Sequence, residues 1–212
     1  MKKIGTLLLT LSLVTIVGCG NNKSNNSIHH INNENISTNE VSKEKEVKSY
    51  QTIEPVLKSR EDITRILGDN FTSFYDEVED YTWFMPTQNI GVFKCSINPC
   101  MYFSDSDGDV GWIVFRYAGD QWVFFDSLII KTDNNKYTKT FDYGEVKEDM
   151  DVGGVTETVE VPFDKEMYKT LEDIVHSDKA IIRFSGEHIY DYEVTQQDKQ
   201  LIQAFLDCYT FE

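Results

Sequence analysis

Apolar residues are unevenly distributed along the 212-residue chain, and their pattern divides it into three parts. A largely apolar run follows the charged pair Lys2 and Lys3 and ends near residue 17. Residues 20–49 are rich in Asn and Ser, contain no aromatic residue and show no apolar period. From Tyr50 onward, aromatic and β-branched residues recur between turn residues, which is typical of a folded domain. The pattern predicts a signal segment at 1–18, a disordered tether at 19–49 and one globular domain at 50–212.

The first predicted element of the domain is a short helix between Ser59 and Gly68. Ser59 is an N-cap candidate, and Asp62 stands three residues further on. Apolar residues then follow at helical spacing, and Gly68 is a typical helix end.

The middle of the domain alternates short apolar, aromatic-rich stretches with Gly, Pro, Asn and Asp, which predicts β-strands. The expected strands cover residues 81–85, 92–95, 100–104, 112–117, 122–131, 136–143 and 156–161. Asp133, Asn134 and Asn135 form the expected turn of one hairpin. The last of these strands alternates Thr, Glu and Val, so we expect it to be half exposed.

The C-terminal third returns to helical spacing. Asp164 is expected to cap one helix and Thr195, with Asp198, a second; strands at 179–184 and 190–194 lie between them, joined by a turn at Ser185 and Gly186. The apolar stripes of these two helices are Met167, Leu171, Ile174 and Val175, and Leu201, Ile202, Phe205 and Tyr209. Strands in one block with helices at the ends predict an α+β fold, mainly an antiparallel β-sheet with one short N-terminal helix and two C-terminal helices.

Charge narrows the classes of partner. The formal net charge is −16, and without Lys2 and Lys3 it becomes −18, from 18 basic and 36 acidic residues. Because phosphate recognition needs a basic face, no nucleic-acid partner is expected. An acidic surface suits solubility, association with cations or a basic protein partner.

The end of the first apolar run carries the most specific motif, Ile16-Val17-Gly18-Cys19. In this position it resembles the lipobox of bacterial lipoproteins. The resemblance implies a diacylglycerol group on the Cys19 thiol, cleavage before Cys19, and a lipid anchor at the extracytoplasmic face of the cell membrane. Two acyl chains give durable attachment, whereas one gives only marginal binding. The alternative is an incidental cysteine in an uncleaved membrane helix, for which the apolar run is short.

Three alternating acids, Asp105, Asp107 and Asp109, resemble the first half of a calcium loop. An EF-hand loop needs glycine at position six and glutamate at position twelve. Counted from Asp105, these positions hold Val110 and Arg116. A hairpin turn therefore explains the segment better, with calcium as the second interpretation, and no other cofactor is expected.

The remaining cysteines suggest a disulfide and a core residue. Cys95 and Cys100 flank Asn98-Pro99, so a turn there would let a disulfide clip a hairpin, which an extracytoplasmic location permits. Cys208 stands among apolar residues and is expected in the core. No spacing of Cys and His suits zinc, and the pair His29-His30 is interpreted as solvated.

No catalytic motif is visible in the sequence, and His176 and His188 stand at an expected helix end and turn. Two function classes follow. The first is a membrane-tethered binding module that contacts an envelope protein or a wall component. The second is a surface-anchored hydrolase whose acidic or histidine site is scattered along the chain. The absence of a catalytic motif favours the binding module.

Two further resemblances concern the domain itself. The stretch from Trp122 to Glu157, together with Ala180 to Gly186, resembles uncharacterised lipoproteins and phage-associated proteins of Gram-positive bacteria. It implies a shared domain and transfers no functional residue. The helix from Arg60 to Gly68 before an aromatic strand resembles small lipoprotein domains of the outer-membrane assembly and β-lactamase-inhibitor type.

Overall fold

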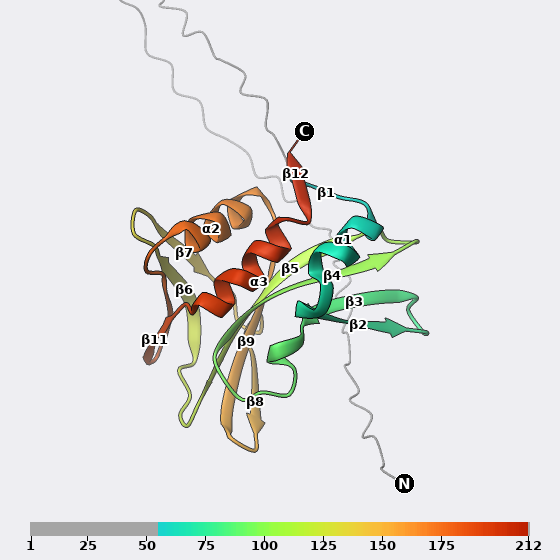
Figure 1. Ribbon diagram of the computed structural model, residues 1–212. Helices are drawn as coiled ribbons and strands as arrows, with labels where there is room; N and C mark the ends of the chain where they lie inside the picture. The colour runs from blue at the N-terminus through green and yellow to red at the C-terminus, as the bar shows by residue number, and fades with distance from the viewer. Residues whose placement is uncertain (1–54, 212) are drawn as a thin grey trace, which may run out of the picture. The chain divides into compact units, whose positions relative to one another are not determined.

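The computed structural model describes residues 55–211, which fold into three α-helices and twelve β-strands (Figure 1). Every strand pair is antiparallel, so the predicted α+β class is confirmed. The predicted signal segment, Cys19, the tether and the pair His29-His30 lie outside the described residues. None of the helices within 55–211 is long and apolar enough to cross a membrane.

The larger of the three sheets has six strands in the order β2-β3-β4-β5-β9-β8. Its strands are β2 (Phe71–Asp76), β3 (Tyr81–Pro86), β4 (Ser96–Ser104), β5 (Val110–Gly119), β8 (Lys147–Asp151) and β9 (Gly154–Pro162). Neighbours in this order are joined by hairpins except β5 and β9, because the chain first leaves the sheet to form β6 and β7.

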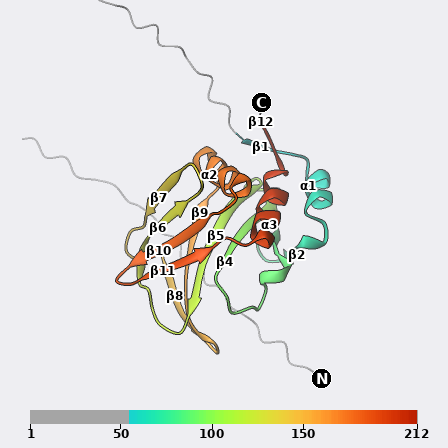
Figure 2. The ribbon, with the colours of Figure 1, turned by 60° about the vertical axis from the view of Figure 1, so that its left-hand side comes forward.

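A second sheet of four strands stands beside the first (Figure 2). Its order is β11-β10-β6-β7, formed by β6 (Phe125–Lys131), β7 (Lys136–Thr140), β10 (Ile181–Gly186) and β11 (Ile189–Glu193). The rings of Phe184 on β10 and Tyr117 on β5 lie 6.0 Å apart and join the cores of the two sheets. The third sheet is small and pairs β1 (Pro55–Leu57) with β12 (Tyr209–Phe211), the two ends of the described segment.

The three helices begin where their capping residues stand in the sequence. They are α1 (Arg60–Leu67), α2 (Lys165–His176) and α3 (Gln196–Leu206). The side chains of Ser59, Asp164 and Thr195 each accept a hydrogen bond from a backbone N–H in the first turn, as predicted. Gly68 ends α1 with a positive φ of 48°, and short 3₁₀ turns follow at Gly68–Asn70 and Thr87–Asn89.

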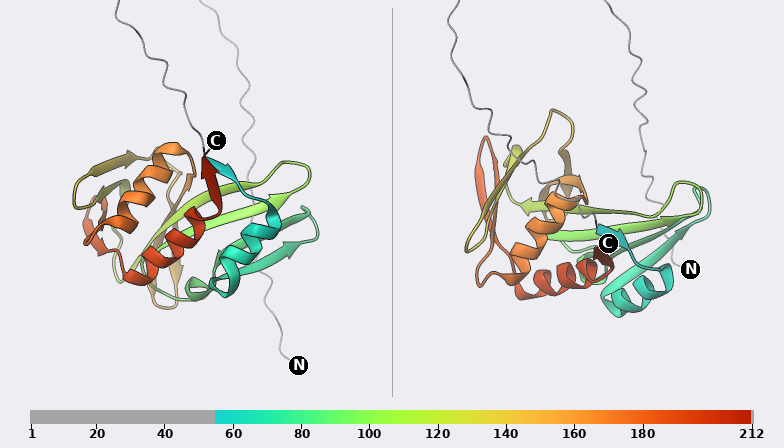
Figure 3. Two further views of the ribbon diagram at one scale, coloured as in Figure 1. Left: turned by 45° about the horizontal axis from the view of Figure 1, so that its top comes forward. Right: turned by 90° about the horizontal axis from the view of Figure 1, so that it is seen from above.

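The six-stranded sheet has an inner and an outer face. The inner face carries Ile97 and Met101 of β4 and Ile113 and Phe115 of β5, which are all fully buried. All three helices lie on this side, as the view from above in Figure 3 shows. Residues of the opposite parity, such as Tyr102 and Trp112, form the outer face and are only half buried.

Two predictions about residues 92–99 are wrong. No strand forms at 92–95, and the carbonyl oxygen of Val92 accepts a hydrogen bond from Arg116 Nη1 at 3.0 Å. The expected turn at Asn98-Pro99 is absent, because both residues lie inside β4. Proline is tolerated there since β3 pairs only with residues 101–104 and requires no N–H from Pro99.

Other boundaries also differ from the predictions. The strand expected at 122–131 begins only at Phe125, because Phe124 adopts a φ of +50°. The turn expected at Ser185-Gly186 lies two residues later, and Tyr209 belongs to β12 and not to α3. Four further strands were not predicted: β1 and β12 have only three residues each, β8 is exposed throughout, and the aromatic residues of β2 do not alternate with a period of two.

Candidate functional site

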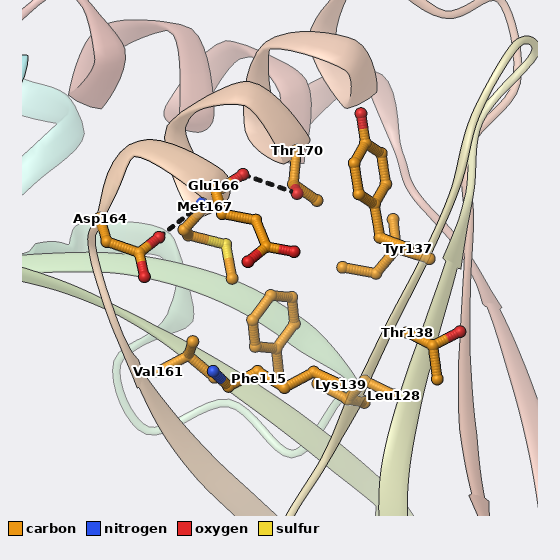
Figure 4. A pocket seen from close by; sticks show the side chains of 11 residues that line it. Phe115, Leu128, Tyr137, Thr138, Lys139, Val161, Asp164, Glu166, Met167 and Thr170 are labelled. Carbon is orange, nitrogen blue, oxygen red and sulfur yellow. Dashed lines mark hydrogen bonds between the residues drawn. The ribbon is translucent and has the colours of Figure 1, made fainter. Parts of the chain in front are cut away.

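The structure contains a cavity of about 110 Å³ between the start of α2 and the strands β6 and β7 (Figure 4). The carboxylate of Glu166 points into it above the ring of Phe115. The N-cap Asp164 accepts a hydrogen bond from Met167 N at 2.8 Å, and Thr170 Oγ1 donates one to the Glu166 carbonyl at 2.9 Å, so the helix turn that carries Glu166 is well ordered by its own bonds.

This cavity is a poor candidate for catalysis. Its volume is below the several hundred Å³ typical of small-molecule sites. Neither described histidine lines it: His176 ends α2 with Nδ1 2.8 Å from the Glu172 carbonyl, and His188 lies in the exposed turn between β10 and β11. Among residues 55–211, no histidine therefore lies beside Glu166 to serve as an acid–base partner.

The three cysteine thiols within residues 55–211 are buried and are poor nucleophiles. Cys95, Cys100 and Cys208 are all free, and burial raises the pKa of both Cys100 and Cys208 to about 12. A high pKa keeps a thiol protonated and so weakens it as a nucleophile. Because Cys100 lies well inside a continuous strand that starts at Ser96, the strand separates it from Cys95 by roughly 15 Å, far beyond disulfide reach. The hairpin clip expected between them does not form in this structure.

The three aspartates of the β4–β5 turn do not converge on one point: two of them contact Arg60 and the third contacts Tyr81. Arg60 of α1 pairs with Asp105 at 2.6 Å and with Asp109 at 2.6 Å, and it also donates to the Ser104 carbonyl. Asp107 instead accepts a hydrogen bond from the Tyr81 hydroxyl at 2.5 Å. Arg60 thus supplies the positive charge between Asp105 and Asp109 that a calcium ion would otherwise bring, and no group of three potential metal ligands occurs within 55–211.

Glu157 holds a structural position that its sequence pattern does not reveal. The alternation of β9 predicts a half-exposed strand and places Glu157 on the same face as Val159 and Val161, but it gives no partner for a buried carboxylate; Glu157 is fully buried between β9 and the start of β6. Its carboxylate accepts hydrogen bonds from the backbone N–H groups of Val123, Phe124 and Phe125 at 2.5, 2.9 and 2.8 Å. The carboxylate fixes the bend at Phe124, so we assign it to folding and not to chemistry.

The outer face of the six-stranded sheet carries a continuous set of aromatic rings. We call this set the aromatic face; it consists of Phe74, Tyr81, Trp83, Tyr102 and Trp112. Strand register explains it, because Phe74 pairs with Trp83, Trp83 with Tyr102 and Tyr102 with Val110, which gives one row across four strands.

Contacts between the rings hold the aromatic face together. Tyr81 stacks on Tyr102 with centroids 4.8 Å apart and an interplanar angle of 19°. Trp83 meets Trp112 edge to face at 5.3 Å and 89°, and it meets Tyr102 at 5.3 Å and 53°. The rings therefore support one another in fixed orientations before any partner arrives, which lowers the entropy lost on binding.

Several apolar side chains of this surface are exposed to solvent. Phe74 is 45% exposed, and the neighbouring Met85 and Val110 are 38% and 40% exposed. Half-buried aromatic rings in one contiguous patch are typical of a recognition surface. The signal in the sequence is the period of two in Tyr81-Thr82-Trp83 and Val110-Gly111-Trp112, although register across strands cannot be deduced from it.

Comparison with known proteins adds no constraint, since no family model, curated protein or solved structure gives a significant match to this chain.

Proposed function

We propose that this protein is a cell-envelope lipoprotein, anchored through Cys19 at the extracytoplasmic face of the cell membrane, whose domain is a binding module. The aromatic face is the surface that contacts the ligand. The observation that supports this proposal is the row of half-buried and exposed rings across four strands, which alternate along the strands with the buried residues of the inner face.

Aromatic rings that stay open to solvent carry a cost for the protein. Exposed aromatic rings on a sheet attract non-specific association, and a fold that needs them only for stability would bury them. Here the inner face of the same strands already supplies a closed core. Rings that the core does not need are best explained by a contact that they make with another molecule.

The anchor and the binding surface are tested separately. Replacement of Cys19 with Ala in the full chain is expected to abolish lipidation and release most of the protein from the membrane fraction, as measured by fractionation and mass spectrometry. Retention of the variant at normal levels would contradict the lipoprotein proposal and leave the aromatic face unaffected.

For the binding surface, the full chain is incubated with purified cell-wall sacculi and, separately, with solubilised envelope proteins. Replacement of Trp83 with Ala is expected to reduce capture about tenfold, because such central aromatic residues carry much of a binding energy. The matched control replaces Trp122, which stacks on Phe124 outside the aromatic face, with Phe. Equal capture by both variants would contradict the assignment of the aromatic face.

A further inference from the structure

We propose that the ligand of the aromatic face is a basic peptide segment of a partner protein. This inference rests on the proposed function and adds the chemical class of the ligand. It depends on the charges that border the rings and on the angles between the rings.

Two acidic loops border the aromatic face at one end of the sheet. The β2–β3 loop contains Glu77, Glu79 and Asp80, which are all exposed, and no lysine or arginine of residues 55–211 forms an ion pair with them. The β4–β5 loop adds Asp107, and the pairing of Tyr81 with Ser104 places the two loops at the same end. Carboxylates that form no ion pair keep their negative charge uncompensated, so this end of the sheet attracts cations.

Two basic residues of the outer face, Arg116 and Lys147, are already paired and lie at its other end. Arg116 pairs with Asp151 at 3.6 Å, and Lys147 pairs with Glu160 at 2.9 Å. On the inner side, Arg60 is held by Asp105 and Asp109 and lies 5.3 Å from the centre of the Phe103 ring. At the end of the sheet where the two loops lie, the aromatic face is therefore bordered by acids that have no ion pair with a lysine or arginine of residues 55–211.

A hydrogen bond joins the acidic β4–β5 loop directly to a ring of the aromatic face. Asp107 accepts the Tyr81 hydroxyl at 2.5 Å, and this bond raises the pKa of Tyr81 to about 12. A cationic side chain above Tyr81 would meet both the face of a ring and a carboxylate, and these two attractions add.

Ring geometry separates a peptide from a glycan. Sugar rings stack on aromatic platforms that share a plane, but Trp83 and Trp112 are inclined to each other by 89° and Trp83 and Tyr102 by 53°. Inclined rings present their faces in different directions, which suits the aliphatic stem and the cationic head group of one side chain. A lysine or arginine side chain has both parts, so the geometry favours the peptide.

The size of the row fits an extended segment. Four neighbouring strands at their usual spacing place Phe74 and Val110 about 14 Å apart. About four or five extended residues cover this length. A segment lying along the row would have the rings beneath it and the acidic loops along one side.

The experiment titrates the full chain, in a non-ionic detergent, with a synthetic peptide of alternating Lys and Leu and with the same peptide in which Gln replaces Lys. Two of the three tryptophans, Trp83 and Trp112, belong to the aromatic face, so tryptophan emission reports binding directly. The Lys peptide is expected to shift the emission and to bind about tenfold more tightly than the Gln peptide, with an advantage that shrinks as salt is raised.

Two variants and one control locate the interaction. Glu77→Gln with Glu79→Gln is expected to weaken binding of the Lys peptide about fivefold, because each exposed charge contributes modestly. Phe74→Ala, at a 45% exposed residue of the edge strand β2, is expected to weaken the binding of both peptides about fivefold. Glu172→Gln with Glu187→Gln removes two exposed acids elsewhere and should change nothing.

Each outcome decides between the proposals. Equal binding of the Lys and Gln peptides, or no loss in the Glu77 and Glu79 variant, overturns the basic ligand but leaves the binding surface standing if Phe74→Ala still weakens capture. Binding of a soluble wall oligosaccharide that depends on Phe74, without peptide binding, likewise replaces the peptide with a glycan. Peptide binding that none of the variants changes overturns both this inference and the assignment of the aromatic face.

Discussion

The two faces of the six-stranded sheet are built by the same strands and differ in how they use aromatic residues. On the inner face, Phe115 lies in a closed core beneath the helices and is fully buried. On the outer face, Trp83 and Tyr102 contact other rings and remain partly open to solvent. The inner rings contribute to stability through burial, whereas the outer rings contribute partly to stability and retain surface for a partner.

The comparison therefore predicts that substitutions on the two faces separate stability from binding. Inner substitutions should lower the free energy of unfolding strongly. Outer substitutions should lower it less but reduce binding more.

The largest effect is expected for Phe115→Ala. The substitution leaves a cavity in a fully buried site and should lower the free energy of unfolding by about 4 kcal/mol. Urea denaturation followed by far-UV circular dichroism measures the loss. A loss below about 1 kcal/mol would contradict the contribution of the buried Phe115 side chain to the stability of the inner face.

Glu157→Gln is expected to cost about 2–3 kcal/mol, because one amide oxygen cannot replace the two carboxylate oxygens that accept three backbone N–H groups. Glu160→Gln is the matched control: it lies on the same strand, is exposed and pairs only with Lys147. This control should change the free energy of unfolding by less than about 0.5 kcal/mol in the same denaturation experiment. Equal losses for the two variants would contradict the role given to Glu157.

Trp83→Ala should cost about 1–2 kcal/mol, since it removes ring contacts from a half-buried site but opens no closed cavity. The more decisive measurement compares the loss of binding with the loss of stability in this variant. Binding to envelope fractions should fall about tenfold while thermal unfolding remains cooperative. A stability loss as large as that of Phe115→Ala, without a binding defect, would make Trp83 an ordinary core residue.

The smallest effect concerns pH. Tyr81 keeps its proton to about pH 12 in the folded protein because Asp107 accepts its hydrogen bond, whereas its ordinary pKa is 10.0. Between these values the unfolded chain has released this proton and the folded chain has not, so stability falls as pH rises. Tyr81→Phe should make the decline between pH 10 and 12 shallower, as seen in melting temperatures across that range. An identical decline would place the titrating groups elsewhere, for example at Tyr137, whose pKa is also raised to about 12.

Local rules predicted the helices well and the strands unevenly. Ser59, Asp164 and Thr195 each act as the expected cap, because capping depends only on neighbours in the chain. The prediction of a turn at Pro99 was wrong. Whether a strand tolerates a proline depends on which of its N–H groups the neighbouring strand needs, and here that is set by how far β3 extends along β4. The same limit hid β8, whose five exposed residues pair with β9 without an apolar face.

The candidate site was less predictable than the fold. Aromatic residues at alternate positions of β3 and β5 were visible in the sequence, but their assembly into one surface required the register of four strands. The aspartates of the β4–β5 turn drew attention as metal ligands, yet Arg60 approaches them from a helix more than 40 residues away in the chain. Long-range pairing of this kind leaves no pattern within a single segment.

The small sheet formed by β1 and β12 has a mechanical consequence. It ties Pro55 to Phe211 through three residue pairs, and Lys58 adds a backbone hydrogen bond to Cys208 at 2.9 Å. A pull on the chain through Pro55 would load these pairs before it reached α1 or the six-stranded sheet. The two-stranded pairing would thus yield first under tension and shield the aromatic face from distortion.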